Sequence, residues 1–598
     1  IILGDSKCAV VIDARTISKE RIKESVRKIE GKKIIAHNMK FDFKMMYYHF
    51  NIRLTKVYCT MVASAILYNG VETEHSLDVV IRRLFNKVIS KITRSSFINK
   101  PDTSKFTKEE IIYAGTDTEY LENLYYRFMD MSNKLDVDKT IQLEMDFLPV
   151  LSIMELQGLK IDEVKLLEIV KEKEEELNLI LADLKKELLI LHDTYGCLSK
   201  DFTSGKKKDK ELRAVYNMFE VPEEQSYAKN IANSFNFGSS TQITTLLSKI
   251  GIKLDSTGSE AIEYFNRNNF DNPVKPLLKK LLNYREILKF LSTYGQGFLD
   301  SRNKVTNRIH SDFSQVFTDT GRLSSRKYEV DNCNYEGANL QNIPHDKRMR
   351  SCFIAREGYS ILTIDYSGQE IALAAKQSRD TVLIAACNEG LDVHSILATN
   401  TYRIITKNPN FIINKEQNED LRNKHKPVLF GYFYGAGASR IADILDIPTD
   451  VARKVYRSLA DKLWELTAYQ EKIKERIKKY FIVRDNSYTN RFRYFQDLNL
   501  GIMEEYKALK EGVNFPIQSS GASMIKKALI DCQQAIEDND IDARILLTVH
   551  DEIVFEVHDS IKEDVKTVFE TIMVDAAKLF LEDINIKAEG KLDKHWSK

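Results

Sequence analysis

The chain has 598 residues, of which 43% are hydrophobic and 29% are charged, and its formal net charge is +1. At roughly 150 residues per domain, these values predict a globular protein of about four structural units. No run of about 18 apolar residues occurs, which argues against a membrane span, and the near-neutral charge means that any nucleic-acid site must be a local patch. The seven cysteines form no Cys-x-x-Cys pair, which argues against a zinc site and for a reducing intracellular compartment.

Residues 1–135 alternate strand-like and helix-like segments. AVVIDA (9–14) and KKIIAHN (32–38) predict strands, and ISKERIKESVRKIEG (17–31) between them predicts a helix. The first region is therefore predicted to be an α/β unit.

The next region is predicted to be helical. Apolar residues recur at helical spacing from about Leu135 to Leu191, which predicts a long amphipathic helix or a helical hairpin. FNFGSSTQ (235–242) places Ser and Thr directly before an apolar-periodic run, a signal for a helix N-terminus. GKKKDKE (205–211) is either a solvated basic insertion or a loop that contacts phosphate.

Two apolar strand-like segments each deliver a carboxylate. YSILTIDYSGQE (359–370) contains Asp365, and ILLTVHDEIVFEV (545–557) contains His550, Asp551 and Glu552 between two apolar flanks. The second pattern predicts a hairpin turn, but a buried carboxylate is unfavourable unless it is paired, hydrogen-bonded or bound to a metal. Two strands with one carboxylate each would suit two Mg²⁺ ions that serve a phosphoryl transfer.

Between these segments lies RNKHKPVLFGYFYGAG (422–437), in which cations and aromatics recur every four residues. On a helix they form one stripe, made of Arg422, Lys426, Phe430 and Tyr434. Such a stripe would suit a triphosphate at one end and a base and sugar at the other. The alternative is an ordinary helix with a basic end.

Together these segments resemble the family A DNA polymerases, the bacterial polymerase I (Klenow) type. DYSGQE resembles motif A, RNKHKPVLFGYFYG motif B and VHDE motif C. Four further blocks agree in order and spacing: TGRLSS (320–325), NLQNIP (339–344), DVHS (392–395) and NFPIQSSGAS (514–523).

The resemblance implies a multidomain α/β and α+β protein. An RNase H-like 3′–5′ exonuclease domain at 1–135 would precede a right-hand polymerase domain. Its parts would be connecting helices and thumb at 136–300, palm at 301–375 and 501–598, and fingers at 376–500.

The resemblance also implies a role for each motif residue. Asp365 and Asp551 would hold two Mg²⁺ ions, with Glu552 as a peripheral helper, and Arg422 and Lys426 would grip the triphosphate. The nucleotide would also meet Phe430, Tyr434, Glu370, Gln369 and His550, with Glu370 excluding ribonucleotides. DNA contacts, chiefly in the minor groove, would come from Arg322, Asn514, Gln518, Asn339 and Gln341.

Two departures from the family pattern stand out. In motif A, Gly368 replaces the usual Gln and Gln369 fills a slot that is usually apolar, so a packing or hydrogen-bonding role there is in question. In motif B, Pro427 follows Lys426, and Pro is tolerated only in the first turn of a helix. Either the helix starts near Lys424, with Arg422 in the preceding turn, or it is kinked.

The first region resembles the family's exonuclease in two motifs. AHNMKFDFKMM (36–46) resembles the second motif, with Asn38 and Asp42, and YAGTDTEY (113–120) resembles the third, with Tyr113 and Asp117. The first motif, Asp-x-Glu, is missing, since 13–15 read Asp-Ala-Arg. The strand that bears it would lie upstream of this sequence, or the domain is degenerate and structural. An active site here would take Mg²⁺ or Mn²⁺.

The implied partners are primer–template DNA and dNTPs, without a membrane, and the enzyme is expected to be monomeric. The alternatives are a non-catalytic DNA-binding homologue and a single-subunit RNA polymerase. The abundance of Lys, Asn and Ile is typical of an AT-rich genome. With a weaker resemblance to plastid (apicoplast) members of the family, it predicts an organellar location.

Overall fold

The computed structural model describes most of the chain. The residues outside the description are 6, 30, 90–95, 98–99, 102, 199–222, 270–271, 327–328, 331–334, 497, 499–500 and 598, and they include the basic stretch 205–211. The chain divides into two compact units, one formed by Ile1–Ile161 with Asn303–Lys598 and the other by Asp162–Arg302. None of the described helices is long and apolar enough to cross a membrane.

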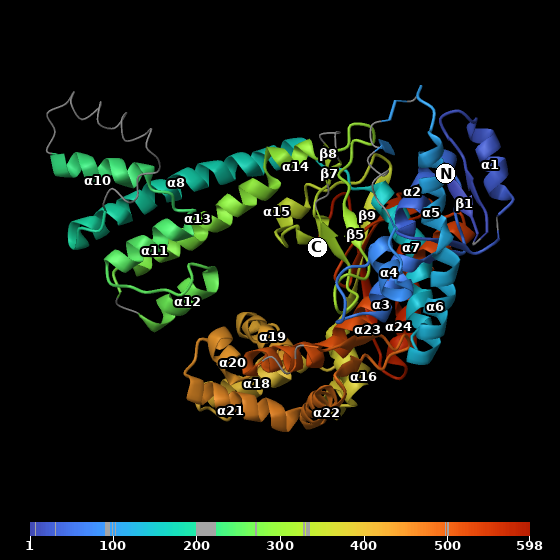
Figure 1. Cartoon of the computed structure of the whole chain (residues 1–598). Helices are drawn as coiled ribbons and strands as arrows, with labels where there is room; N and C mark the ends of the chain where they lie inside the picture. Colours follow the sequence, from blue (N-terminus) through green and yellow to red (C-terminus); the bar gives the residue numbers. More distant parts are fainter. Residues whose placement is uncertain are drawn as a thin grey trace. The chain divides into compact units, whose positions relative to one another are not determined.

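The N-terminal region has the predicted strand–helix–strand alternation (Figure 1). Strands β1 (Ile2–Gly4) and β2 (Ala9–Val11) pair antiparallel, and β3 (Ile34–Ala36) and β4 (Val57–Cys59) pair in parallel. The helices are α1 (Lys19–Arg27), α2 (Met39–Phe50), α3 (Thr60–Leu67), α4 (Leu77–Phe85), α5 (Lys108–Glu119) and α6 (Leu121–Leu135). Within the described part of the chain, no strand joins the two pairs into one sheet.

A four-stranded antiparallel sheet forms the centre of the first unit. Its strands, in spatial order, are β12 (Ala543–Val549), β13 (Glu552–His558), β9 (Tyr359–Ser367) and β14 (Lys587–Asp593). The apolar flanks of the sequence become β9, β12 and β13, which are almost fully buried. Helices α24 (Lys562–Leu581), α23 (Ile502–Asp538) and α7 (Asp138–Gln157) pack against this sheet.

The chain between β9 and α23 is mainly helical. Its helices are α16 (Gln369–Ser378), α17 (Thr381–Glu389), α18 (Val393–Thr406), α19 (Glu419–Phe433), α20 (Ala438–Leu445), α21 (Thr449–Lys462) and α22 (Trp464–Tyr480). Figure 1 shows α18 to α21 gathered into one group, and they pack against one another. A hairpin of β10 (Ile482–Arg484) and β11 (Phe492–Tyr494) follows.

Short elements precede the sheet in the first unit. They are β5 (Asp312–Ser314), β6 (Ser324–Arg326), β7 (Glu329–Val330), β8 (Tyr335–Glu336), the 3₁₀ helix η3 (Leu340–Asn342) and α15 (Lys347–Arg350). The N-terminal region is joined to this part by partly buried ion pairs. Lys40 of α2 donates to Glu155 of α7 at 2.7 Å and to Asp312 of β5 at 2.6 Å, and Lys44 donates to Glu155 at 2.8 Å.

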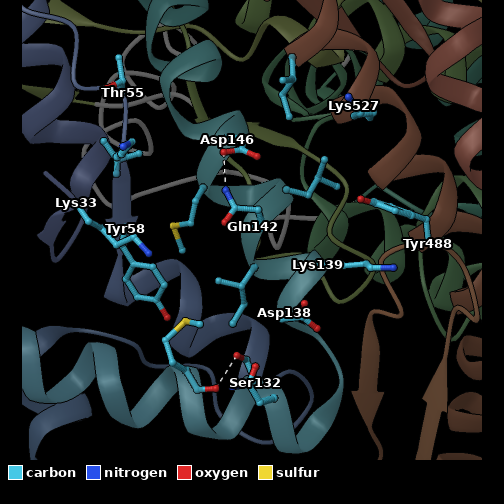
Figure 2. Close-up of a pocket in the computed structure, with 18 residues that line it drawn as sticks. Lys33, Thr55, Tyr58, Ser132, Asp138, Lys139, Gln142, Asp146, Tyr488 and Lys527 are labelled. Atoms are coloured by element: carbon cyan, nitrogen blue, oxygen red, sulfur yellow. Dashed lines mark hydrogen bonds between the residues drawn. The ribbon is translucent and has the colours of Figure 1, made fainter. Parts of the chain in front are cut away.

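A cavity of about 670 Å³ lies on the same junction (Figure 2). Its lining includes Lys33 and Tyr58 from the N-terminal region and Lys139 and Asp146 from α7. Lys139 lies over the ring of Tyr488, 4.7 Å from the ring centre. The cavity contains none of the residues that the sequence singled out, so its size does not make it the candidate site.

The second unit is helical, as the sequence predicts. Its helices are α8 (Glu163–Tyr195), α10 (Glu223–Ser234), α11 (Ser240–Lys249), α12 (Ser259–Asn268), α13 (Lys275–Tyr294) and α14 (Gln296–Asp300). The predicted helix start at FNFGSSTQ is confirmed, because the Ser239 hydroxyl accepts from the Gln242 amide and caps α11. A core of Leu and Ile side chains holds α8, α11 and α13 together.

Candidate active site

Asp365 and Asp551 come from neighbouring strands of the central sheet. Glu552, the first residue of β13, pairs with Asp365 of β9 in the antiparallel register. Asp551 directly precedes Glu552, in the two-residue turn between β12 and β13. The other turn residue, His550, has a φ of 57°, which is uncommon for a residue other than glycine. The sheet therefore places the backbone of Asp551 next to the residue that pairs with Asp365, although the two aspartates are far apart in the sequence.

These carboxylates have the oxygen chemistry that Mg²⁺ prefers. Mg²⁺ is usually held by one or two carboxylates together with water and substrate phosphates, rather than by a cage made only of protein groups. In the described ranges, no group of three or more His, Cys, Asp or Glu side chains gathers as a metal site. Two carboxylates are therefore compatible with the protein part of such a magnesium site.

Glu552 differs from Asp551 in its surroundings. Its carboxylate is buried, with the residue only 5% exposed, and it accepts from the indole Nε1 of Trp596 at 2.7 Å. Arg350 donates to its other oxygen at 3.4 Å and lies over the Trp596 ring, 4.3 Å from the ring centre. Glu552 is therefore anchored beneath the turn. No pattern in the sequence had pointed to Arg350 or Trp596.

The predicted cation–aromatic stripe lies on α19. The helix begins at Glu419 and Arg422 lies inside it, so the alternative of a start near Lys424 is wrong and the alternative with Pro427 inside the helix stands. Pro427 also lies inside the helix, where it lacks the N–H that would donate to the carbonyl of residue 423. The acidic residues Glu419 and Asp420 in the first turn favour an earlier start, because negative charge stabilises a helix N-terminus.

Arg422 is held in place by Asp392, the first residue of the DVHS block. Its Nε and Nη2 donate to the two oxygens of Asp392 at 2.8 and 2.9 Å. Burial alone would raise the pKa of Asp392, but hydrogen bonds from Arg422 and Ser395 outweigh it and lower the pKa. Asp392 therefore stays ionised and orients one of the two cations expected to bind triphosphate.

His394 is a site residue that the sequence analysis had not singled out. Its ring meets that of Phe430 edge-on, with centroids 5.7 Å apart. Burial, followed by the charges of Arg422 and Lys426, lowers its pKa to about 4, so the ring is neutral at pH 7. Its place within DVHS was the only signal for it.

Glu370 links the end of β9 to the end of α19. Arg322 donates to its carboxylate at 3.3 Å. Tyr434 caps the C-terminus of α19, and burial, then the nearby Glu370 charge, raises the pKa of its hydroxyl. Gln518 of α23 also lies at this hydroxyl. The structure thus gathers four of the predicted nucleotide and DNA residues at one place.

A cavity of about 350 Å³ collects more of the predicted residues. It is lined by Arg322, Leu323, Ser324, Ser325, Asn339, Gln341, Asn342, Gln369, Gly521, Ala522, Ile525, Thr548 and His550. Neither Asn514 nor Gln518 is among its lining residues, although both lie on α23 like Gly521. Five of the predicted nucleotide and DNA residues therefore share this cavity, and its lining contains amides and the Arg322 cation but no carboxylate.

The exonuclease-like residues lie on two helices of the N-terminal region. Asn38 precedes α2 in the left-handed conformation, with a φ of 60°, and Asp42 lies in the first turn. Burial raises the pKa of Asp42 to about 6. Tyr113 and Asp117 lie on α5, which packs against β1 and β2. The described residues of this region gather no cluster of metal ligands.

In comparisons with known proteins, two family models match two separate regions of the chain. The model of DNA polymerase family A matches residues 209–598, and the model of a 3′–5′ exonuclease matches residues 3–133. DNA polymerase I of Aquifex aeolicus is 24% identical over 613 residues, covering 100% of this chain and 93% of that protein. DNA polymerase I of Treponema pallidum is 26% identical over 535 residues, covering 88% of this chain. The alignment spans 47% of the Treponema protein, about half its length.

One solved structure shares the fold over nearly the whole chain. It is the POL domain of Pol1 from M. smegmatis in complex with DNA primer-template and dNTP, with a TM-score of 0.76 at 22% identity. The likeness covers 98% of this chain and 91% of that one. With an exonuclease domain preceding the polymerase match, the chain belongs to DNA polymerase family A.

Proposed function

We propose that this chain performs template-directed DNA synthesis, adding dNMP from a dNTP to a primer 3′-OH with release of pyrophosphate. The observation that carries the proposal is the sheet register, which sets the Asp551 turn beside Asp365. When bound there, two Mg²⁺ ions would stabilise the charge on the attacking and leaving oxygens.

The helical group supports the same reaction with its cations. Arg422, oriented by Asp392, and Lys426 would bind the triphosphate and neutralise the departing pyrophosphate. Neutral His394 would offer a ring N–H to a phosphate oxygen, and Phe430, against that ring, would lie along the sugar. Glu370, fixed by Arg322, would occupy the space of a 2′-OH.

Primer extension tests the proposal most directly. The full chain would be given a primed template, Mg²⁺ and either dNTPs or rNTPs, with Asp365→Asn as the control. Extension with dNTPs that disappears in the control supports the two-metal assignment. Extension that survives in the control refutes it, no extension by the unaltered chain favours a non-catalytic homologue, and preferential use of rNTPs favours an RNA polymerase.

We propose a 3′–5′ proofreading role for the N-terminal region, supported by Asp42, Tyr113 and Asp117 on helices α2 and α5. The test is excision of a mismatched primer terminus by this chain and by a chain extended upstream. Excision by the extended chain alone would assign the missing carboxylates to the upstream segment. No excision by either would favour a structural domain.

Two further parts of the proposal rest on composition and resemblance. A plastid location would be checked by the position of a fluorescent fusion of the complete protein. A monomeric state would be checked by light scattering of the purified chain with and without primer–template DNA.

A further inference from the structure

Gln369 carries a buried amide with an unused donor. It is the first residue of α16, directly after Gly368, whose φ of 74° turns the chain out of β9. The residue is 5% exposed, and within the described part of the molecule its Nε2 has no hydrogen-bond partner. A buried donor without a partner destabilises a protein, and such groups are rare.

The surrounding structure makes room for this amide. A Cβ added at Gly521, in the interior of α23, would lie 3.0 Å from the Gln369 Oε1. Glycine inside a helix is less favourable than alanine, so its presence at position 521 needs a reason in the packing. A leucine at position 369 would bring no unpaired donor, so simple packing does not explain the side chain that is present.

The amide belongs to the 350 Å³ cavity described above, whose lining has no carboxylate. Two other lining amides take part in hydrogen bonds. Gln341 donates to the Thr548 carbonyl at 3.3 Å, and the Asn339 oxygen accepts from Ser325. Such a cavity suits a ligand that presents hydrogen-bond acceptors. His550 lines the same cavity, and the next residue in the chain is Asp551. The cavity therefore lies beside the turn that carries Asp551.

We propose that Gln369 determines specificity by donating from Nε2 to a minor-groove acceptor of the primer-terminal base pair. This inference rests on the proposed DNA synthesis. Purine N3 and pyrimidine O2 lie in similar places in every Watson–Crick pair, so a single donor can hydrogen-bond to any of the four pairs. A mispair displaces these acceptors and leaves the amide unpaired again, so extension from it is slowed.

The test removes the acceptor and the donor separately. Single-nucleotide extension is measured with 3-deazaguanine or guanine at the primer terminus, and with the same replacement one and two pairs upstream. The unaltered chain should lose about fivefold in kcat/KM at the terminus, as expected for a hydrogen bond of about 1 kcal/mol. In Gln369→Leu and Gln369→Met this penalty should disappear, and discrimination against mispaired termini should fall about fivefold.

Gln533→Leu is the matched control, because Gln533 is a nearly buried amide on α23 whose Nε2 donates to Glu537, and it does not line the cavity. It should keep the full penalty. An equal terminal penalty in the unaltered chain and in both Gln369 variants would overturn the proposal. The proposal would also be overturned if 3-deazaguanine at the terminus caused no loss of kcat/KM in the unaltered chain. That measurement does not depend on the folding of any variant. Failure to extend natural primers would instead overturn the proposed function.

Discussion

The indole N–H of Trp596 donates to the carboxylate of Glu552 at 2.7 Å, so residues far apart in the sequence meet at the base of the turn between β12 and β13. Trp596 is fully buried and Arg350 is 1% exposed. The adjacent carboxylates of VHDE therefore have different surroundings: Glu552 is enclosed by a cation and an indole, whereas Asp551 lies in the turn.

This difference predicts that substitution of Glu552 mainly lowers stability, whereas substitution of Asp551 mainly lowers activity. Glu552→Ala should lower the free energy of unfolding by about 3–5 kcal/mol, because it leaves Arg350 buried without its counter-charge. Asp551→Ala should leave stability nearly unchanged and reduce kcat by about 10³-fold or more, as expected for a lost metal ligand. Urea unfolding and primer extension on both variants provide the measurements. Equal stability of the two variants would contradict the assignment.

The bond between Arg422 and Asp392 predicts a defect in nucleotide binding. Asp392→Asn removes the charge that orients the guanidinium, so KM for dNTP should rise about tenfold with a smaller change in kcat. Arg422→Lys cannot make the bidentate contact and should act through the same link. In the double variant, the change in KM for dNTP, expressed as a free energy, should therefore be much smaller than the sum of the changes in the two single variants. Additive effects would show that the pair does not act as a unit.

The buried His425 side chain predicts that the folded state loses stability in acid. Burial, and then the nearby His394, lowers the pKa of His425 to about 3, whereas the unfolded chain titrates near 6.5. As pH falls from 6.5 towards 3, the unfolded state binds a proton that the folded state does not, so folding becomes less favourable. In His425→Gln the slope of unfolding free energy against pH should be smaller by up to about 1.4 kcal/mol per pH unit. An unchanged slope would exclude this contribution.

The ion pairs of Glu155 join the N-terminal region to α7, and they should contribute more to the free energy of unfolding than an exposed ion pair does. Glu155→Gln leaves Lys44 without its carboxylate and Lys40 with Asp312 as its remaining carboxylate, and should lower the free energy of unfolding by about 1–3 kcal/mol. Asp130→Asn, in the exposed pair of Asp130 with Lys134, is the matched control and should change it by less than about 0.5 kcal/mol. Denaturant unfolding measures both. Similar effects would mean that the junction pair is not a buried structural contact.

Much of the fold and of the candidate site could be read from local patterns. The apolar flanks of VHDE predict β12 and β13, and the spacing of Arg422, Lys426 and Phe430 predicts one face of a helix. Such patterns are visible because strands and helices repeat every 2 and 3.6 residues. Family motifs added roles for these residues. Pro427 left two alternatives for the start of α19, and the structure has the earlier start, with the acidic Glu419 and Asp420 in the first turn.

Contacts between distant segments were decided only by the tertiary structure. Trp596 and Arg350 meet Glu552, and Asp392 orients Arg422, through side chains that no sequence spacing relates. The unpaired amide of Gln369 is likewise invisible in the motif, because burial and hydrogen-bond satisfaction depend on every neighbour in space. The sequence by itself determined the family and the candidate site residues, because the motifs are local patterns. Packing determined which of them are exposed to a substrate and which are held by other side chains.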